Sequence, residues 1–329
     1  MRRITFTSES AERCQLIFGK AFAGRLPESL KIVDSGFRKV FGERLEDEYL
    51  MPGGEHVKSV DRVFEIYQVI RASRRKAITA VGGGSLIDLV GYASSGHTDI
   101  EKLFLFPTTT VSQVMPALKG FRVNFEFVKD LLSFNCLPDK VFIDFEVSYR
   151  EYACSSKSVL IFPLLVALSF DNRLFKYLFN VVVSGKDISA EQWEDIVFSS
   201  VKAYLKGIET GRFVVGTEIG RLIETASRLK AGYDASLLFG AMMELRLAEK
   251  FGTGDSSVTE DFFRVVKLLW DSRWSSRIDM SSLVDLVEQK GGVRISTPDG
   301  NLDKTYFVGC SVFERFVREK TWRGLENFV

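Results

Sequence analysis

Three consecutive glycines stand between an apolar stretch and residues at helical spacing in AVGGGSLIDLVGYASS, residues 80–95. Glycines in a row cost backbone entropy, so their presence indicates that something approaches the chain closely. A strand, a glycine-rich turn and a helix form a corner whose N–H groups and helix N-terminus suit a phosphate or pyrophosphate. Such a corner can also be a tight turn with close strand–helix packing and no ligand. Taken alone, Gly82, Gly83 and Gly84 leave both interpretations open.

Three other polar or glycine-rich turns follow apolar runs in the first half of the chain. Asp34 ends the run LKIVD, a Pro-Gly-Gly turn follows DEYLM, and threonines 108–110 follow KLFLFP. Short strands that alternate with helical patterns indicate a parallel α/β sheet, in which ligands bind at the carboxyl ends of the strands. We therefore expect the four turns to meet at one edge of a sheet.

The elements that position these turns differ between the two halves of the chain. Alternating patterns predict strands near residues 3–7, 30–35, 47–52, 76–82, 102–107 and 139–144, with a helix over 59–74. From about residue 150 onward the apolar spacing is helical, and strand patterns return only at 292–297 and 304–309. We expect a Rossmann-like α/β domain over residues 1–148 and an all-α domain over 149–329.

The bulk composition narrows the classes of function. The 329 residues are 46% hydrophobic and 26% charged, with a net charge of +1, so nothing favours nucleic acid or an anionic membrane. The longest apolar stretch, SVLIFPLLVALSF, is too short to span a bilayer and predicts a buried helix. MRRITFTSES has no apolar core behind its arginines, so no secretory signal is predicted. Four scattered cysteines without a CxxC pair predict reduced thiols in a cytoplasmic protein.

Histidine is scarce in this chain. The two histidines are His56 and His97, and none follows residue 97. This distribution excludes any mechanism that needs an imidazole in the second half of the chain.

Taken in order, the turns resemble the dehydroquinate synthase-like proteins, relatives of the glycerol and iron-dependent alcohol dehydrogenases. The similar stretches are PGGEHVKS (52–59), VGGGSLIDLVGYASS (81–95), FPTTTVSQV (106–114), VNFEFVKD (123–130), PDKVFID (138–144) and GTEIGRLIE (216–224). The resemblance covers about residues 30–252. It implies a protein that binds NAD between two domains; dehydroquinate synthase itself also uses a divalent metal, usually zinc.

The resemblance also implies which residues bind NAD. The three glycines 82–84 would take the pyrophosphate, Asp34 and Glu55 would contact the adenosine ribose, and Lys58 would lie nearby. Thr108, Thr109 and Lys129 would line the nicotinamide side, and Asp88 stands at the family's matching aspartate. Each feature has a structural alternative. Asp34 can end a strand, Glu55 and Lys58 can form an exposed pair, Asp88 can interact with the helix dipole from the first turn, and the threonines can be ordinary strand residues.

The metal ligands of the family are not matched. The family uses one glutamate and two histidines. The resemblance places one histidine at Thr217, the other near Tyr233, and the glutamate within several residues of Phe162. Arg221 stands where the family has a catalytic histidine, and its fixed positive charge would repel a dication. The resemblance therefore implies NAD as cofactor and makes zinc an unlikely one. Arg221 can instead clamp an anion between the domains or form a salt bridge between helices with Glu218 or Glu224.

The substrate contacts are partly replaced as well. The family's Asp-Ser-Ser-x-Gly-Gly-Lys-Thr stretch is MPALKGFR here, so Met115 and Phe121 replace the aspartate and the lysine. Lys119 and Arg122 flank Phe121 and can hold a phosphate or carboxylate, or can belong to a solvated loop. The candidate catalytic residues are thus Lys119, Arg122, Lys129 and Arg221.

Two functions remain open at this point. The first is an NAD-dependent carbon–oxygen lyase of the dehydroquinate synthase type, acting in the cytoplasm as a homodimer on a phosphorylated sugar acid and without the usual zinc. The second is a non-catalytic nucleotide-binding partner or regulatory subunit of a true family member. Both predict an anionic small-molecule or nucleotide ligand, and neither involves nucleic acid or a membrane.

Overall fold

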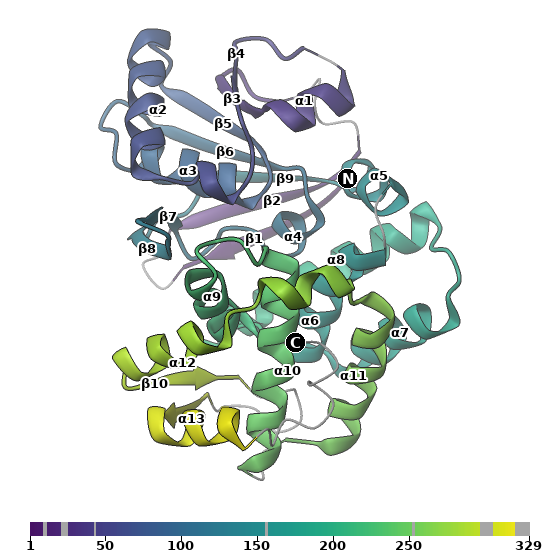
Figure 1. The fold of residues 1–329 in the computed structure, drawn as a ribbon. Coiled ribbons are helices and arrows are strands. Elements are labelled where there is room, and N and C mark those ends of the chain that lie inside the picture. Colours follow the sequence, from purple (N-terminus) through teal and green to yellow (C-terminus); the bar gives the residue numbers. More distant parts are fainter. Residues whose placement is uncertain are drawn as a thin grey trace. The chain divides into compact units, whose positions relative to one another are not determined.

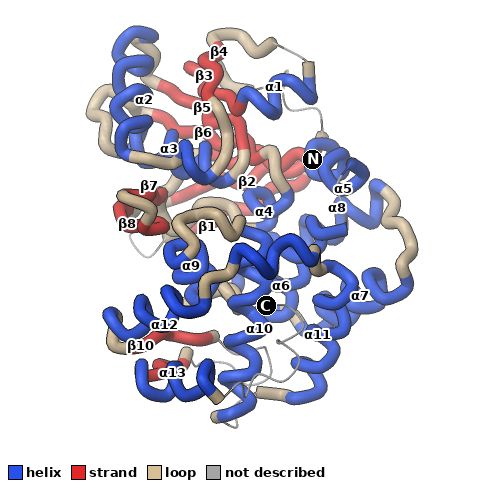
Figure 2. The backbone as a smooth tube through the Cα atoms, in the orientation of Figure 1, coloured by secondary structure: helices blue, strands red, loops and turns tan. Residues whose placement is uncertain are grey.

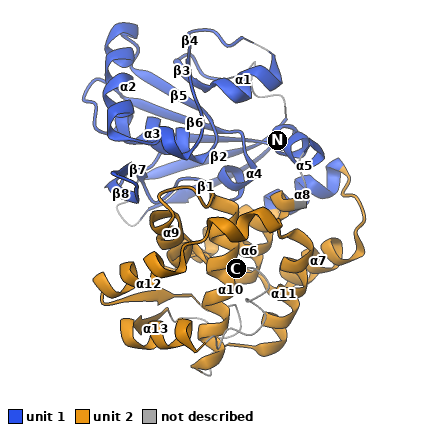
Figure 3. Cartoon of the chain, viewed as in Figure 1, with its two compact units in different colours: residues 1–154, 190–198 blue, residues 155–189, 199–329 orange. Residues whose placement is uncertain are grey.

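The structure is a computed structural model, and it describes residues 1–8, 12–20, 26–42, 44–154, 157–251, 254–296 and 305–319. The described chain divides into two compact units (Figure 3). Unit 1 comprises residues 1–154 and 190–198, and unit 2 comprises residues 155–189 and 199–329. The expected boundary after residue 148 therefore falls inside a helix of unit 1, α5 (Phe145–Cys154).

Unit 1 is built on a sheet whose described strands number seven, in the order β1-β2-β9-β6-β5-β3-β4. All neighbouring pairs are parallel except β1 and β2. The strands are β1 (Arg2–Thr7), β2 (Arg13–Gly19), β3 (Leu30–Asp34), β4 (Glu48–Met51), β5 (Ala77–Gly82), β6 (Lys102–Pro107) and β9 (Lys140–Asp144). This parallel sheet with helices confirms the predicted Rossmann-like fold of the first domain (Figures 1 and 2).

The helices of unit 1 connect these strands. They are α1 (Ser35–Phe41), α2 (Val60–Ser73), α3 (Gly84–Ser95), α4 (Thr110–Val114), α5 and the first half of α8 (Ala190–Glu209), with a short 3-10 helix η2 (Glu55–Val57). A small antiparallel hairpin, β7 (Phe121–Phe125) and β8 (Val128–Phe134), lies outside the main sheet. The hairpin and strand β2 were not anticipated from the sequence.

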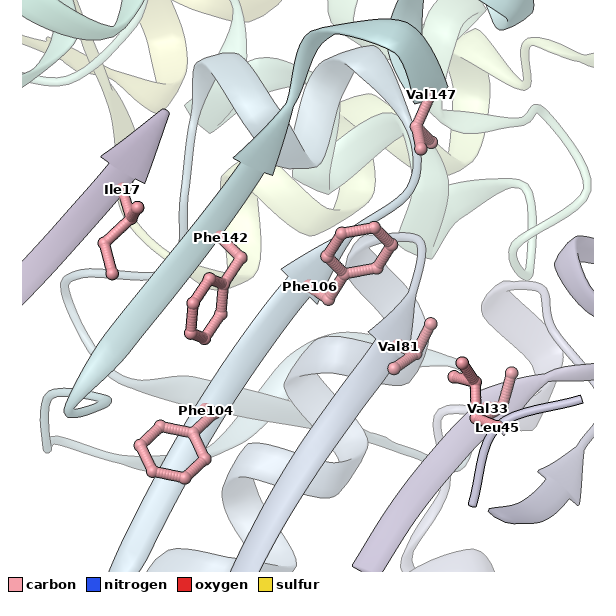
Figure 4. Close-up of a cluster of buried hydrophobic side chains, with 8 residues drawn as sticks. All are labelled: Ile17, Val33, Leu45, Val81, Phe104, Phe106, Phe142 and Val147. Carbon is pink, nitrogen blue, oxygen red and sulfur yellow. The ribbon is translucent and has the colours of Figure 1, made fainter. Parts of the chain in front are cut away.

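A layer of buried apolar side chains covers one face of the sheet (Figure 4). Val33, Val81 and Phe106 project from neighbouring strands into it, and Val147 of α5 joins them. Phe37 and Phe41 of α1 pack against this layer. Helices α2 and α3 lie beside one another on the sheet, and α3 contacts β5 and β6. Because both faces are covered, the strands can carry continuous apolar runs, as residues 103–107 of β6 do.

Unit 2 is mainly helical, as predicted. Its elements are η3 (Lys157–Leu160), α6 (Ile161–Phe170), α7 (Asn172–Ser184), the second half of α8, α9 (Thr217–Ala226), α10 (Tyr233–Lys250), α11 (Ser256–Leu269), η4 (Ser272–Arg277), α12 (Met280–Gln289), β10 (Gly292–Ile295), β11 (Tyr306–Gly309) and α13 (Cys310–Arg318). All ten residues of α6 are buried, which confirms that the longest apolar stretch forms a core helix. Strands β10 and β11 pair with one another, as their sequence patterns indicate.

Candidate functional site

The sheet order brings the predicted turns together at one edge. Strands β6, β5, β3 and β4 are neighbours, and each ends at a turn that was singled out from the sequence. The chain leaves β3 toward β4 on one side and leaves β5 toward β6 on the other, so β3 and β5 flank a switch point in the topology. Crevices at such switch points, outside the carboxyl ends of the strands, are where open α/β sheets bind ligands.

Asp34 lies at this switch point and has a structural role there. Its Oδ1 atom accepts hydrogen bonds from the backbone N–H groups of Gly36 (2.7 Å) and Phe37 (3.2 Å), so it caps α1. Its Oδ2 atom makes no hydrogen bond within the described chain. A Cβ atom built on Gly53 would lie 1.9 Å from that oxygen, and one built on Gly82 would lie 3.2 Å from Cβ of Asp34. Glycine at both positions lets the neighbouring backbones approach the carboxylate.

The three glycines form the corner between strand β5 and helix α3. Strand β5 ends at Gly82, Gly83 is the N-cap of α3, and Gly84 is the first residue of that helix. A Cβ on Gly83 would lie 3.2 Å from Cγ2 of Thr109, whereas a Cβ on Gly84 would meet nothing within 4 Å. The first N–H groups of an α-helix have no partner within the helix. The corner therefore combines unpartnered donors with open space.

The threonines after β6 form one wall of this corner. The backbone N–H of Thr108 donates to the carbonyl of Gly82 (2.9 Å), which ties the two strand ends together. Thr109 and Ser112 form a capping box at the start of α4. Thr110 donates from its backbone and hydroxyl to Glu151, at 2.5 and 2.6 Å. Thr109 therefore faces the glycines while Thr110 anchors the short helix behind it.

A cluster of buried charges lies under α3, and Lys58 is at its centre. The Lys58 ammonium group donates to Asp88 (2.6 Å) and to Asp130 (2.5 Å) and lies 3.9 Å from Glu55. The Lys129 ammonium group lies 2.6 Å from Glu55. Lys58 is only 3% exposed, so the interpretation of Glu55 and Lys58 as an exposed surface pair is wrong. Burial in a paired network is what makes such charges tolerable.

The ionisation of the cluster follows from these contacts. Burial opposes the charge on Glu55, but the ammonium groups of Lys58 and Lys129 hold its pKa at about 2. Burial likewise opposes the charge on Lys58, yet the surrounding carboxylates raise the pKa of its ammonium group. Burial and the neighbouring Asp130 raise the pKa of Asp88, whereas the two lysines lower that of Asp130. Asp88 is thus the carboxyl group of the cluster that most readily takes a proton.

Asp88 also corrects the sequence prediction. It is the fifth residue of α3, because the helix already begins at Gly84. The expected position in the first turn, where a carboxylate interacts with the helix dipole, is therefore wrong. The position of Asp88 is instead explained by its ion pair with Lys58, which lies in the turn after β4.

Three polar residues that complete the cluster were not among the predicted site residues. Asn124 donates to Oε1 of Glu55 (2.8 Å) and accepts from the backbone N–H of Asp130 (2.9 Å). Ser85, the second residue of α3, donates to Oε2 of Glu55 (2.6 Å). Asp130 has a left-handed backbone with φ of 55°. In the sequence, only the position of Asp130 directly after Lys129 indicated that Asp130 could belong to the site.

Lys119 and Arg122 do not join the cluster. Both side chains are exposed. Arg122 lies opposite Ser133 on the outward face of the hairpin, whereas Lys129 is buried on its inward side. The structure therefore brings together Glu55, Lys58, Asp88 and Lys129 but not Arg122.

In unit 2, Arg221 and its neighbours lie on or near α9. The Arg221 guanidinium donates to Glu218 (3.2 Å), which is three residues earlier on the same helix. Glu218 is one of the two predicted partners, so the predicted salt bridge is present, but it lies within α9 and does not join two helices. The hydroxyl of Thr217 donates to the carbonyl of Val214 (2.7 Å).

Phe162 and Tyr233 come together in unit 2. Their rings stack with centroids 6.0 Å apart and planes at 19°, joining α6 to the start of α10. Phe162 is 4% exposed. Two of the three positions that the resemblance matched to metal ligands are thus in contact, and their side chains form an aromatic pair.

Glu244 has a buried carboxyl group that contacts the start of α9. It lies on α10, and its oxygens accept from the backbone N–H groups of Ile219 (3.5 Å) and Ser296 (3.1 Å). Burial raises its pKa to about 8, against the opposing effect of these backbone donors.

Within the described ranges, no three His, Cys, Asp or Glu side chains are grouped so that they could hold a metal ion. No described helix is both long enough and apolar enough to cross a bilayer.

Comparison with known proteins agrees with this arrangement. The family described as 3-dehydroquinate synthase N-terminal matches residues 48–150. The chain is 29% identical to a 3-dehydroquinate synthase of Dehalococcoides mccartyi over 255 residues, covering 71% of this chain and 69% of the relative. It is 27% identical to a 3-dehydroquinate synthase of Sulfurisphaera tokodaii, covering 73% of each chain.

Solved structures share the fold over almost the whole chain. The 2-epi-5-epi-valiolone synthase ValA of Streptomyces hygroscopicus, with NAD⁺ and Zn²⁺ bound, has a TM-score of 0.74, 18% identity and 97% coverage of both chains. A 2-deoxy-scyllo-inosose synthase in complex with carbaglucose-6-phosphate, NAD⁺ and Co²⁺ has a TM-score of 0.72, 17% identity and coverage of 97% and 99%. Residues 48–150 thus match the 3-dehydroquinate synthase family model, most of the chain is similar to 3-dehydroquinate synthases, and the fold is that of the structural neighbours.

Proposed function

We propose that this chain binds NAD at the carboxyl ends of β3, β5 and β6, and that it acts on a phosphorylated sugar acid without zinc. The observation that carries the proposal is the glycine corner at the topological switch point. Gly84 faces open space there, and the neighbouring Asp34 keeps one carboxylate oxygen without a partner in the described chain. The family relatives and the NAD-bound structural neighbours support the choice of nucleotide.

The residues at the strand ends suit the parts of a dinucleotide. The N–H groups at Gly83 and Gly84 would receive the pyrophosphate at the N-terminus of α3. Oδ2 of Asp34 would accept a hydrogen bond from a ribose hydroxyl. Thr108 and Thr109, on the opposite wall of the corner, would lie toward the nicotinamide. When bound, NAD supplies a reversible hydride acceptor.

In this proposal the charge cluster has a structural role. Glu55, Lys58 and Asp88 are engaged with one another, so they would fix the turn after β4 against α3. Lys129 is held by Glu55 at the edge of the same cluster. We propose that Lys129 and Lys119 of unit 1 supply positive charge to an anionic substrate. Arg221 of unit 2 is a separate proposed anion-binding residue. Arg122 is left out because it projects from the opposite face of the hairpin.

The residues at the family's metal positions do not fit zinc. Zinc sites in proteins use thiolate, imidazole and carboxylate ligands. Phe162 has no donor atom, the hydroxyl of Thr217 is engaged by a backbone carbonyl, and Tyr233 stacks on Phe162. We therefore propose no step that depends on a metal. Any catalytic turnover would instead depend on the positively charged lysine and arginine side chains.

A non-catalytic role is the second candidate. The stacked pair Phe162–Tyr233 favours it, because an aromatic contact that stabilises the fold stands where the family has ligands. The ion pair between Arg221 and Glu218 also satisfies that cation within its own helix. In this case the chain would bind NAD and act as a regulatory partner of a true family member.

Calorimetric titration with NAD tests the nucleotide site. We expect one NAD per chain, and Gly84→Val should weaken binding at least 100-fold because its side chain would fill the open space at the corner. Gly309→Val is the matched control, since Gly309 is also at a helix N-terminus and a Cβ added there would meet nothing within 4 Å. Absence of NAD binding by the folded wild-type protein would overturn the proposal.

Zinc titration and turnover separate the remaining alternatives. We expect no stoichiometric zinc binding, and one tightly bound zinc per chain would contradict the metal-free assignment. Formation of dehydroquinate from a heptulosonate phosphate would establish the lyase activity. NAD binding with no turnover of this or other phosphorylated sugar acids would support the non-catalytic role.

A further inference from the structure

One cavity of unit 1 lies away from the carboxyl ends of the strands. Helices α2 and α3 lie side by side (Figure 1), and α3 runs for 12 residues, about 18 Å, from the glycine corner to Ser95. The cavity is at that far end of α3. Its volume is about 380 Å³, which is in the range of pockets that hold small molecules. It is lined by Tyr67, Gln68 and Arg71 of α2 and by Gly96, His97 and Thr98, which follow α3.

Gly96 keeps part of this cavity free of side chains. Its φ of −86° and ψ of −2° lie in the right-handed region that is open to all residues, so the backbone does not require glycine. A Cβ atom built on Gly96 would lie 3.1 Å from the hydroxyl oxygen of Tyr67, closer than such atoms normally pack. Glycine at this position therefore leaves the Tyr67 hydroxyl uncovered.

Four of the lining side chains have polar groups that make no hydrogen bond or ion pair within the described residues. These are the hydroxyls of Tyr67 and Thr98, the amide of Gln68 and the guanidinium of Arg71. Burial raises the pKa of Tyr67, so its hydroxyl keeps its proton and can donate it in a hydrogen bond. The cavity thus has several donors that a ligand could use.

His97 adds one more donor. Its Nδ1 atom accepts a hydrogen bond from the backbone N–H of Asp99 (3.2 Å). A neutral imidazole that accepts at Nδ1 carries its proton on Nε2. Within the described chain that Nε2–H group has no partner, so it can also donate to a ligand.

A row of aromatic rings lies along one side of the cavity. The Tyr67 ring is edge-on to that of Phe64, with centroids 6.2 Å apart, and the His97 ring lies 5.8 Å from that of Tyr67. Phe64, Tyr67 and Arg71 are spaced i, i+3 and i+7, so they share one face of α2. Phe64 is 59% exposed, so the apolar surface continues outward from the cavity. Such ring faces and edges suit the packing of another planar ring.

The charges favour an anion in the cavity. Arg71 carries a permanent positive charge, and none of the six lining residues is acidic. A guanidinium group can donate two parallel hydrogen bonds to a phosphate or a carboxylate. The hydroxyl, amide and imidazole donors around it could bind the remaining oxygens of that group. A cationic ligand would instead be repelled by Arg71.

We propose that this cavity binds a small molecule in which a planar ring carries a phosphate or carboxylate group. Arg71 holds the anionic group, and the side chains of Tyr67 and His97 pack against the ring. The site is at the opposite end of α3 from the glycine corner, so it is separate from the proposed NAD site and does not depend on it.

Nuclear magnetic resonance of the full chain with labelled histidine tests the proposal. The chain has two histidines, His56 in the turn after β4 and His97 in the cavity, so His97→Gln assigns both imidazole signals. Phenyl phosphate and benzoate carry the two candidate anionic groups on the same ring. The one that fits should shift the His97 signal with a Kd of about 1 mM, as ligands of this size commonly reach. The shift should occur with and without NAD.

Two variants and a control test the geometry with the probe that binds. Arg71→Met should weaken binding about tenfold or more, because it removes charge-assisted hydrogen bonds to the anion. Arg74→Met is the matched control, since Arg74 is also exposed and forms no ion pair in the described part of the chain, but does not line the cavity. It should bind the probe as the wild type does. Gly96→Leu should abolish binding by filling the cavity, and thermal unfolding shows whether each variant is folded.

Two smaller probes separate the parts of the ligand. Phenol lacks the anionic group, and inorganic phosphate lacks the ring. Each should bind about tenfold more weakly than the better of phenyl phosphate and benzoate, because each loses one set of contacts. If phenol binds equally well, the role of Arg71 is wrong, and if inorganic phosphate binds equally well, the role of the aromatic row is wrong.

Three further results would overturn the proposal. The first is a His97 signal that does not shift with either phenyl phosphate or benzoate at tens of millimolar. The second is a shift of the same size and affinity in Arg71→Met as in the wild type. The third is a shift of His56 alone, which would place the probe near the glycine corner and not in this cavity.

Discussion

The residues that the sequence resemblance assigned to ligand binding at the strand ends of unit 1 and in the α6–α9–α10 region of unit 2 have opposite chemistry. In unit 1 two buried lysines and three partly buried carboxylates, centred on Lys58, are paired with one another. In unit 2 the corresponding positions carry a stacked aromatic pair and a threonine engaged by the backbone. Buried charge needs partners or a ligand, whereas stacked rings need neither. The first region is built for polar ligands, and the second can be stable without one.

The largest effect that would test this contrast comes from Lys58. Lys58→Met should lower the free energy of unfolding by about 3–5 kcal/mol, because it leaves the carboxyl groups of Asp88, Asp130 and Glu55 buried with one lysine. Urea denaturation measures the change. The exposed Lys76, paired with Glu101, provides the control, and Lys76→Met should have little measurable effect.

A compensating variant sharpens the same prediction. Adding Asp88→Asn and Asp130→Asn to Lys58→Met should recover part of the lost stability, because the amides need no counter-charge. If Lys58→Met unfolds at the same urea concentration as the wild type, the cluster does not stabilise unit 1 and the contrast with unit 2 fails.

A second prediction concerns Glu244 of α10, a buried carboxyl group whose pKa is strongly raised. The pKa of Glu244 is raised to about 8, so the folded state holds a proton that the unfolded state releases near pH 4.5. Stability contributed by this group is therefore present at low pH and is lost as the pH rises through about 8. Between pH 6 and pH 8 the loss would be about 2 kcal/mol.

The variant Glu244→Gln isolates this contribution. Its side chain does not titrate, so the difference in unfolding free energy between wild type and variant should shrink as the pH rises from 6 to 8. Denaturation at several pH values provides the measurement. A difference that stays constant with pH would show that Glu244 is ionised in the folded protein.

The smallest expected effect concerns the aromatic pair of unit 2. A double-mutant cycle with Phe162→Leu and Tyr233→Leu should give a coupling energy of about 0.5–1.5 kcal/mol, the usual contribution of stacking beyond burial. Phe162→Leu combined with Phe307→Leu, an exposed residue of β11, should be additive. A coupling near zero would mean that the rings contact one another without stabilising unit 2.

Local sequence patterns determined much of unit 1. Apolar runs ending in Asp34, in the Pro-Gly-Gly turn, in the triple glycine and in the threonines predicted parallel strands with a shared edge, and the strand order confirms it. Strand β2 was missed, although it pairs with β1 directly before it as well as with β9 more than a hundred residues further along the chain. The hairpin was missed because its left-handed residues Glu126 and Phe127 form a turn without the glycine or asparagine that usually marks one.

The sequence by itself determined the resemblance to 3-dehydroquinate synthases, the α/β and helical halves, and the absence of histidine beyond residue 97, because all of these follow from residue identity and spacing. Tertiary structure alone decided that Lys58 is buried between Asp88 and Asp130, that Arg122 and Lys129 face opposite ways, and that Phe162 stacks on Tyr233. Lys58 and Asp130 are 72 residues apart in the chain, as are Phe162 and Tyr233 to within a residue. Burial and pairing depend on contacts between residues that are far apart in the chain. Sequence periodicity reflects only residues within a few helical turns of one another.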